Sequence, residues 1–220
     1  MIFLAFEGYN DLQFFRSFFT KIMKARNITR EAPYLVEMFK KLIIENPEVR
    51  VEILSLNNKK LLLLSVGGRE NFEVIAKGLR PIINTIKKEN KENIRGIAFI
   101  ADEDAKKQVN AAIEKLKNLD LQVKKIFYKT HLEDVVLHIT AFTTLEENSK
   151  KLLNTFFSSI EKTFGNDKHI KKRKLSMLHA IVGPRCFGHL FDELFENTDS
   201  QKILENSDIL RGLVDWLAEL

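Results

Sequence analysis

The alternation of short apolar runs with segments of helical periodicity constrains the fold of this 220-residue chain more than any other feature. Runs at 2–6 and 96–101 are short and are bounded by glycine or charged residues, which is typical of buried strands. Between such runs, apolar side chains recur every three or four residues, as in amphipathic helices. This order predicts an α/β fold, in which helices flank both faces of a mixed sheet.

The expected elements of this α/β core fill the first 142 residues. The predicted strands cover 2–6, 49–56, 60–66, 96–101 and 121–128, and 134–141 is interpreted as one further strand. The predicted helices cover 11–25, 32–46, 69–88 and 104–118. Asn57 and Asn58 form a turn-prone pair between two of the strands.

Strand patterns disappear beyond residue 143. A helical stripe at 145–164 ends at Gly165, a residue that often closes helices, and shorter helices are expected at 169–182, 186–196 and 208–220. We therefore expect two parts, an α/β domain at 1–142 and an all-helical C-terminal subdomain at 143–220.

Composition excludes several classes of protein. The chain has one cysteine, Cys186, so neither a disulfide framework nor a cysteine-based zinc site is available. Apolar runs are too short for a membrane span, and the start lacks the basic region of a secretory signal. These features favour a soluble, cytoplasmic protein without a membrane partner.

The charge is unevenly distributed along the chain. The formal net charge is +5, although residues 190–220 contain eight acidic side chains against two basic ones. Basic residues gather just before this tail, and a face formed by them could follow a phosphate backbone. An ordinary solvated helical face remains the alternative. The candidate nucleic-acid-binding residues are Lys168, Lys171, Lys172 and Arg173.

Carboxylates follow two of the predicted strands. Glu7 ends the first apolar run, and Asp102 and Asp104 follow the run at 96–101. Ligand sites of open α/β sheets lie at such strand ends, and Mg²⁺ prefers carboxylate oxygens. Without a cation, crowded carboxylates would repel one another and raise at least one pKa. The pattern predicts a site for Mg²⁺ or Mn²⁺.

Structural roles could also explain these acidic residues. The segment 102–104 precedes a predicted helix, where N-capping and the helix dipole favour acidic side chains. Glu7 could pair with Arg69 or Arg95, and Asp11 could be the N-cap of the first helix. The sequence leaves these alternatives open beside the metal site.

These residues resemble a known family. Glu7-Gly8-Tyr9-Asn10-Asp11 resembles the Glu-Gly-x-x-Asp segment of Toprim domains, especially that of bacterial primases, and Asp102-x-Asp104 resembles their Asp-x-Asp. Gly67-Gly68 resembles the Gly-Gly segment of the OLD-like branch and of small stand-alone archaeal or bacterial Toprim-like proteins. The resemblance covers about residues 1–130 and implies a Toprim or Rossmann-like sheet.

The resemblance implies magnesium-dependent chemistry on phosphodiesters. It gives Glu7 the role of general acid/base and metal ligand, assigns the metal to Asp102 and Asp104, and leaves supporting roles to Gly8, Asp11, Gly67 and Gly68. The chain lacks an assignable topoisomerase tyrosine, the primase zinc module and the OLD ATPase half. A small nuclease is therefore the expected function. The alternatives are a non-catalytic nucleic-acid-binding or regulatory module of DNA repair or replication, and an enzyme acting on a small phosphorylated molecule.

Two other candidate sites are weaker. The segment 65–70 lacks the Gly-Lys-Ser/Thr ending of a phosphate-binding P-loop. Cys186 lies between His179 and His189, but no third residue is evident to orient such a pair, and an apolar helical stripe follows. We expect structural roles for both.

Overall fold

A six-stranded mixed sheet forms the centre of the computed structural model, which describes residues 1–89, 92–128, 131–165, 169–182 and 187–220. The strand order is β2-β3-β4-β1-β5-β6; β4, β1, β5 and β6 are parallel, and β3 is antiparallel to both β2 and β4. The strands are β1 (Ile2–Phe6), β2 (Arg26–Asn27), β3 (Arg50–Leu56), β4 (Lys59–Ser65), β5 (Gly96–Asp102) and β6 (Gln122–Tyr128).

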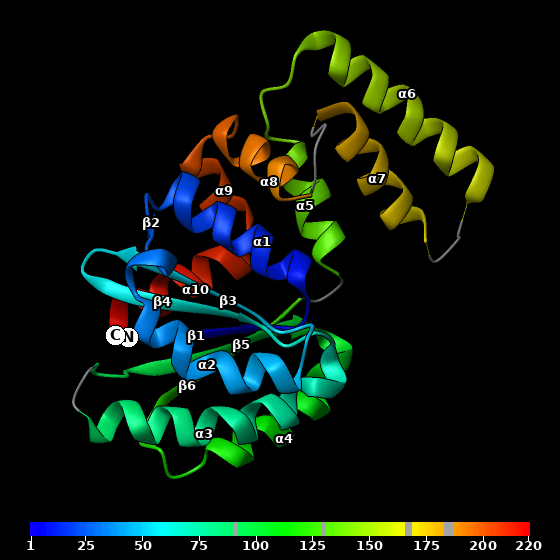
Figure 1. The fold of residues 1–220 in the computed structure, drawn as a ribbon. Helices are drawn as coiled ribbons and strands as arrows, with labels where there is room; N and C mark the ends of the chain where they lie inside the picture. The colour runs from blue at the N-terminus through cyan, green and yellow to red at the C-terminus, as the bar shows by residue number, and fades with distance from the viewer. Residues whose placement is uncertain (90–91, 129–130, 166–168, 183–186) are drawn as a thin grey trace.

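Helices cover both faces of this sheet (Figure 1). The helices are α1 (Tyr9–Ser17), α2 (Pro33–Glu45), α3 (Phe72–Lys88), α4 (Lys106–Leu116), α5 (Leu132–Thr140), α6 (Glu147–Phe164), α7 (Ile170–Val182), α8 (Phe187–Glu196), α9 (Ser200–Asn206) and α10 (Asp208–Glu219). One face packs against α2, α3 and α4, and the other against α1, α5, α8, α9 and α10. Helices α6 and α7 form a hairpin that extends away from the sheet.

Strand β1 occupies an interior position and is buried on both faces. Ile2, Leu4 and Phe6 point into one core, whereas Phe3 and Ala5 point into the other. Because side chains alternate across a strand, a strand between two helical layers must be apolar throughout. This explains the uninterrupted apolar run that begins the chain.

The C-terminal helices complete one of the two cores. The ring of Phe14 in α1 lies 5.5 Å from that of Phe191 and 5.1 Å from that of Phe195, both in α8. Phe14 also meets Phe15 edge to face at 5.3 Å, and all four rings are buried. Aromatic packing therefore joins the helical C-terminal region directly to the first helix of the α/β core.

The predicted α/β fold, a mixed sheet flanked by helices with a helical C-terminal region, is confirmed. The strand expected at 134–141 is wrong, because this segment lies in helix α5. The Asp134 carboxylate accepts a hydrogen bond from the His131 N–H at 3.1 Å, and Leu132, Val136 and Ile139 are buried on one helical face. Val135 and Val136 are β-branched and are typical of a strand, but the N-terminal cap and the helical spacing of the buried residues favour a helix.

The first helix also begins earlier than expected. Gly8 is its N-cap, so Asp11 lies inside the first turn and is not itself the N-cap. The helix ends at Ser17 and continues as a π-helical segment, Phe18–Ile22. Strand β2 and helix α9 were not predicted, although Asp199 caps α9 by accepting the Gln201 N–H at 2.8 Å. Among the described residues, no helix is both long and apolar enough to cross a membrane.

Candidate functional site

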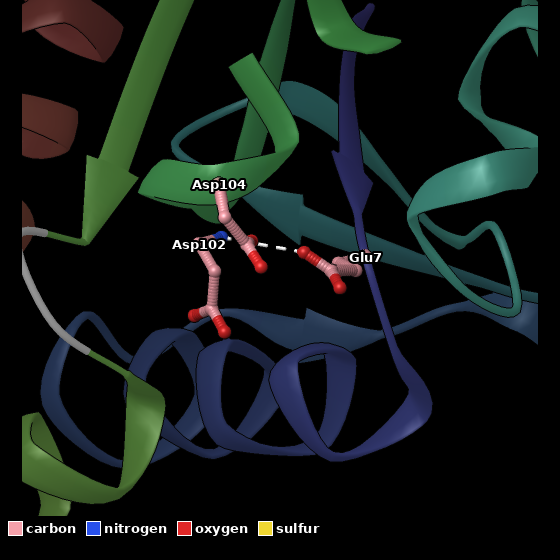
Figure 2. A group of neighbouring side chains, drawn as sticks. All are labelled: Glu7, Asp102 and Asp104. Carbon is pink, nitrogen blue, oxygen red and sulfur yellow. Dashed lines mark hydrogen bonds between the residues drawn. The ribbon is translucent and has the colours of Figure 1, made fainter. Parts of the chain in front are cut away.

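The ends of β1 and β5 bring Glu7 and Asp102 together. These strands are parallel neighbours with Phe6 opposite Ile100, so their carboxyl ends lie at the same edge of the sheet. The Glu7 N–H donates to the Ile100 carbonyl at 3.2 Å, and the Asp102 N–H donates to Glu7 Oε2 at 3.3 Å (Figure 2). Strand pairing therefore positions the Glu7 carboxylate against the β5 backbone.

Asp104 adds a third carboxylate from the turn that follows β5. This turn is a short 3₁₀ segment, Glu103–Ala105. One ligand oxygen each from Glu7, Asp102 and Asp104 lies within 4.8 Å of the others. Figure 2 shows the three side chains grouped beyond the strand ends. The structure therefore brings together the three residues predicted as metal ligands.

The predicted pair Gly67 and Gly68 supports Glu7 from the end of β4. The Gly68 N–H donates to the Glu7 carbonyl at 2.8 Å. Both glycines have positive φ, +77° and +120°, which other residues rarely adopt. A Cβ on Gly67 would also lie 2.6 Å from Cβ of Glu48. This turn therefore requires glycine, and it fixes the backbone beside the carboxylates.

Basic side chains already contact both aspartates. Arg69 pairs with Asp104, and His131 Nδ1 lies 2.7 Å from Asp102 Oδ2. The Asp102 carboxylate caps no backbone N–H of its own turn, so N-capping does not explain it. Neither arginine considered for Glu7 forms an ion pair with it in the described chain, since Arg95 donates to the Leu220 carbonyl.

Asp11 lies near this group and is partly buried. Its Oδ2 accepts the Gly8 N–H at 3.1 Å, which ties the carboxylate to the turn after Glu7. Burial is the main reason that the pKa of Asp11 rises to about 7. The buried Tyr128 hydroxyl lies close to Asp11 and opposes the rise in the pKa of Asp11. Among the described residues, however, no group has the distance and angle of a hydrogen bond to this hydroxyl. Asp11 is therefore a partly buried acid beside the site, with a raised pKa.

Burial and mutual repulsion raise the pKa values of the outer acids. The pKa of Glu7 is raised first by burial and next by the negative charge of Asp102. Burial also raises the pKa of Asp102, against the opposing hydrogen bond from His131. That same hydrogen bond raises the pKa of His131. Burial and mutual repulsion thus disfavour the ionised carboxylates, and a nearby cation would stabilise them.

A cavity of about 330 Å³ opens over these carboxylates. Glu7, Asp11 and Asp102 line the cavity. Leu132 and Leu175, from α5 and α7, also contribute to its lining. A larger cavity of about 670 Å³ lies between β6, α5 and α10, but none of the three predicted metal ligands lines it. The smaller cavity is therefore the one that belongs to the acidic site.

The basic residues predicted to bind nucleic acid are partly engaged within the protein. Lys171 Nζ lies 2.7 Å from Asp134 Oδ2. The Arg173 guanidinium stacks 4.1 Å from the ring centre of Phe164, whereas Lys172 is exposed. Lys168 lies outside the described residues, as does Cys186. The cluster is therefore less open to a partner than its charge alone indicates.

Three residues of the site were not identified from the sequence. His131 follows β6, which ends at the same sheet edge as β1 and β5, so the rule that located the carboxylates could have identified it. Tyr9 lies at the cavity and is 51% exposed, and its place in the Glu-Gly segment was a signal. Tyr128 ends β6 opposite Asp102, so the same strand-end rule could have identified it as well.

The acidic group has the chemistry and nearly the dimensions of a magnesium site. Mg²⁺ binds oxygen at 2.0–2.1 Å, so two oxygens on one ion lie at most about 4.2 Å apart. The observed limit of 4.8 Å is slightly larger. Small side-chain rotations, or one water between an oxygen and the ion, would bridge this difference. Glu7, Asp102 and Asp104 can therefore hold a hard divalent cation.

Comparisons with known proteins support the fold alone. No protein-family model matches the chain, and no curated protein matches it. A solved structure, the hypothetical protein PH0156 from Pyrococcus horikoshii OT3, is similar with a TM-score of 0.59 and 16% sequence identity. The similarity covers 97% of this chain and 94% of that one. The similar fold thus extends over the sheet and the helical C-terminal region together.

Proposed function

We propose that this protein is a Toprim-like, Mg²⁺-dependent enzyme that cleaves nucleic-acid phosphodiesters. The observation that carries the proposal is the approach of Glu7, Asp102 and Asp104 within 4.8 Å at the carboxyl edge of parallel strands. Mn²⁺ is an alternative ion, since it accepts the same oxygen ligands. The bound ion would polarise a phosphoryl oxygen and orient the attacking group.

The protein's own residues divide the remaining tasks. Asp102 and Asp104 would hold the ion, and Glu7 would act beside them as the general acid/base. The raised pKa of Glu7 supports this role, because proton transfer is most efficient when the pKa of the acid approaches the working pH. Gly68 and Asp11 hold the backbone around Glu7 in place through their hydrogen bonds.

A non-catalytic nucleic-acid-binding or regulatory module is the second candidate. The observation that favours it is that Arg69 and His131 already contact the two aspartates. Such contacts offset the negative charge without an ion, so the cluster is compatible with a purely structural role. Metal binding and turnover therefore need separate tests.

A thermal unfolding titration tests the metal site. Mg²⁺ at ten times its Kd adds about 1.4 kcal/mol to the free energy of unfolding, which raises the Tm by roughly 3–6 °C for a chain of this length. Asp102→Asn removes a ligand and should abolish the rise. Glu114→Gln changes an exposed carboxylate of α4 and should retain it. An unchanged Tm of the wild-type protein in Mg²⁺ would contradict the metal site.

Cleavage assays distinguish the enzyme from the binding module. Single-stranded DNA, duplex DNA and RNA are incubated with the protein in Mg²⁺ or Mn²⁺. Loss of a general acid/base typically costs about 10²–10⁴-fold in rate, so Glu7→Gln should reduce turnover by this factor while Glu114→Gln does not. Nucleic-acid binding without cleavage in either metal would favour the module. Turnover confined to small phosphate esters would indicate the third function class considered from the sequence.

A further inference from the structure

The residues that line the cavity over the carboxylates are of two chemical kinds. Glu7, Asp11 and Asp102 are acidic, whereas Leu132, Leu175 and Phe191 are apolar. Metal binding and phosphoryl chemistry require only the acidic residues. The apolar lining therefore favours a further part of the ligand, one that is itself largely apolar.

Tyr9 lines the same cavity. It is the first residue of α1, two positions after Glu7, and 51% of its surface is exposed. Most large aromatic side chains of this chain are buried in the two cores, so this exposure is unusual here. An exposed aromatic ring beside a binding cavity is the arrangement on which nucleic-acid-binding proteins stack bases.

We propose that the cavity binds a single unpaired nucleotide, with its base against Tyr9 and the apolar lining residues and its phosphate at the carboxylate-bound ion. This inference rests on the proposed function, since it assigns the phosphate to that metal site. A nucleobase is flat and largely apolar on its faces, which suits both surfaces. Asn10 and Glu133, which also line the cavity, offer polar groups to the edge of the base.

The size of the cavity favours an unpaired nucleotide over a duplex. Clefts for small ligands measure about 300–1,000 Å³, so a volume of about 330 Å³ holds one small group and no double helix. Bases in a duplex are paired and stacked, and a base must leave the stack before it can enter a pocket. Unpaired bases expose both faces at no such cost.

Helix α7 offers a path for the neighbouring phosphates. Leu175 lines the cavity, and Lys171 lies one turn earlier on the same side of the helix. Exposed Lys172 follows it. A strand whose base enters the cavity would therefore continue beside positive charge, and Lys171 would exchange Asp134 for a phosphate.

Paired oligonucleotides of equal charge test the base-binding site. One probe is a fluorescent single-stranded oligothymidylate, and the other is the same backbone with every base removed. Binding is measured by fluorescence anisotropy in Ca²⁺, which takes similar oxygen ligands. One stacked base contributes roughly a five- to hundredfold gain in affinity, so the thymidylate should bind more tightly by this factor. A duplex of the same length should bind more weakly than the single strand.

Variants of two exposed tyrosines attribute the effect. Tyr9→Ala should remove the preference for the base-containing probe, and Tyr9→Trp should retain it. Tyr34→Ala is the control, because Tyr34 is also exposed, at 37%, but lies in α2 on the opposite face of the sheet. Equal affinity of the wild-type protein for both probes would overturn the proposal, as would tighter binding of the duplex or an unchanged preference in Tyr9→Ala.

Two further measurements separate related outcomes. Tyr9→Ala should keep the Mg²⁺-induced rise in Tm, because Tyr9 is not a metal ligand. If this variant loses the preference for the base-containing probe while the rise in Tm is normal, the base site is supported independently of catalysis. If Mg²⁺ fails to stabilise even the wild-type protein, the metal proposal fails, whereas the probe comparison still reports on the base. Thymidine monophosphate is then tested as a competitor of the oligothymidylate. An affinity equal to that of the oligomer identifies a free nucleotide as the ligand, and a weaker affinity identifies a strand.

Discussion

Replacing Asp11 with asparagine should make the stability of the protein less dependent on pH. Asp11 is partly buried, and its pKa rises from the ordinary value of 3.8 to about 7, mainly because its carboxylate is withdrawn from water. The folded protein therefore holds this proton more tightly than the unfolded chain does. The stabilisation is complete below about pH 4 and is lost as the pH rises through about 7.

The size of this effect follows from the two pKa values. Their difference corresponds to about 4 kcal/mol between the protonated and ionised forms, and about 2.5 kcal/mol of it falls between pH 5 and pH 8. Asparagine is neutral throughout this range, and its side-chain oxygen can still accept the Gly8 N–H. The advantage of Asp11→Asn over wild type should thus grow by about 2.5 kcal/mol from pH 5 to pH 8.

Urea unfolding at pH 5, 6, 7 and 8, in EDTA to exclude divalent metal, measures this difference. Asp208→Asn is a matched control, because the Asp208 side chain is 81% exposed. Its effect on the free energy of unfolding should stay nearly constant over the range. A constant difference between wild type and Asp11→Asn from pH 5 to pH 8 would refute the reasoning, since the buried charge would then not determine stability.

Three further predictions concern the glycine turn, the histidine and the aromatic core. Gly67→Ala should lower the free energy of unfolding by about 2–4 kcal/mol in denaturant titrations, because alanine is strained at this positive φ and its Cβ would lie too close to Glu48. Gly212→Ala is the control: no atom lies near its new Cβ, so it should raise the free energy of unfolding by up to about 1 kcal/mol. NMR titration should give His131 a pKa above 6.5, and this pKa should fall toward 6.5 in Asp102→Asn. The stabilisation that the His131–Asp102 pair contributes is present below pH 6.5 and is lost as the pH rises through the raised pKa. Phe14→Ala should cost about 3–5 kcal/mol in urea unfolding, because it removes a buried ring that packs on three others; a loss below about 1 kcal/mol would contradict this packing.

The central strands and the carboxylates at their ends could be predicted because one physical cause produces both. A strand covered on both faces must be apolar along its whole length, so β1 and β5 are visible in the sequence. The abrupt change to Glu7 and Asp102 then marks where each strand leaves the core. Adjacent parallel strands end at the same edge, and this geometry brings the two residues together.

Helix α5 and the pairing of Arg69 with Asp104 could not be predicted in this way. A short run such as 135–137 is apolar in either a helix or a strand, and only its cap at His131 and Asp134 distinguishes them. Arg69 follows β4 and meets Asp104 only through tertiary structure, whereas the place of His131 after β6 was visible in the sequence. The basic residues of α7 likewise find partners, such as Asp134 for Lys171, that no spacing along the chain reveals.

The packing of Phe14 against α8 has a consequence for the order in which the chain folds during synthesis. Phe14 is made early, whereas Phe191 and Phe195, which cover it, are made more than 170 residues later. Translation at about 5–20 residues per second leaves an interval on the order of ten seconds or more. During this interval the aromatic face of α1 lacks its final cover, so the nascent chain should bind chaperones until α8 leaves the ribosome.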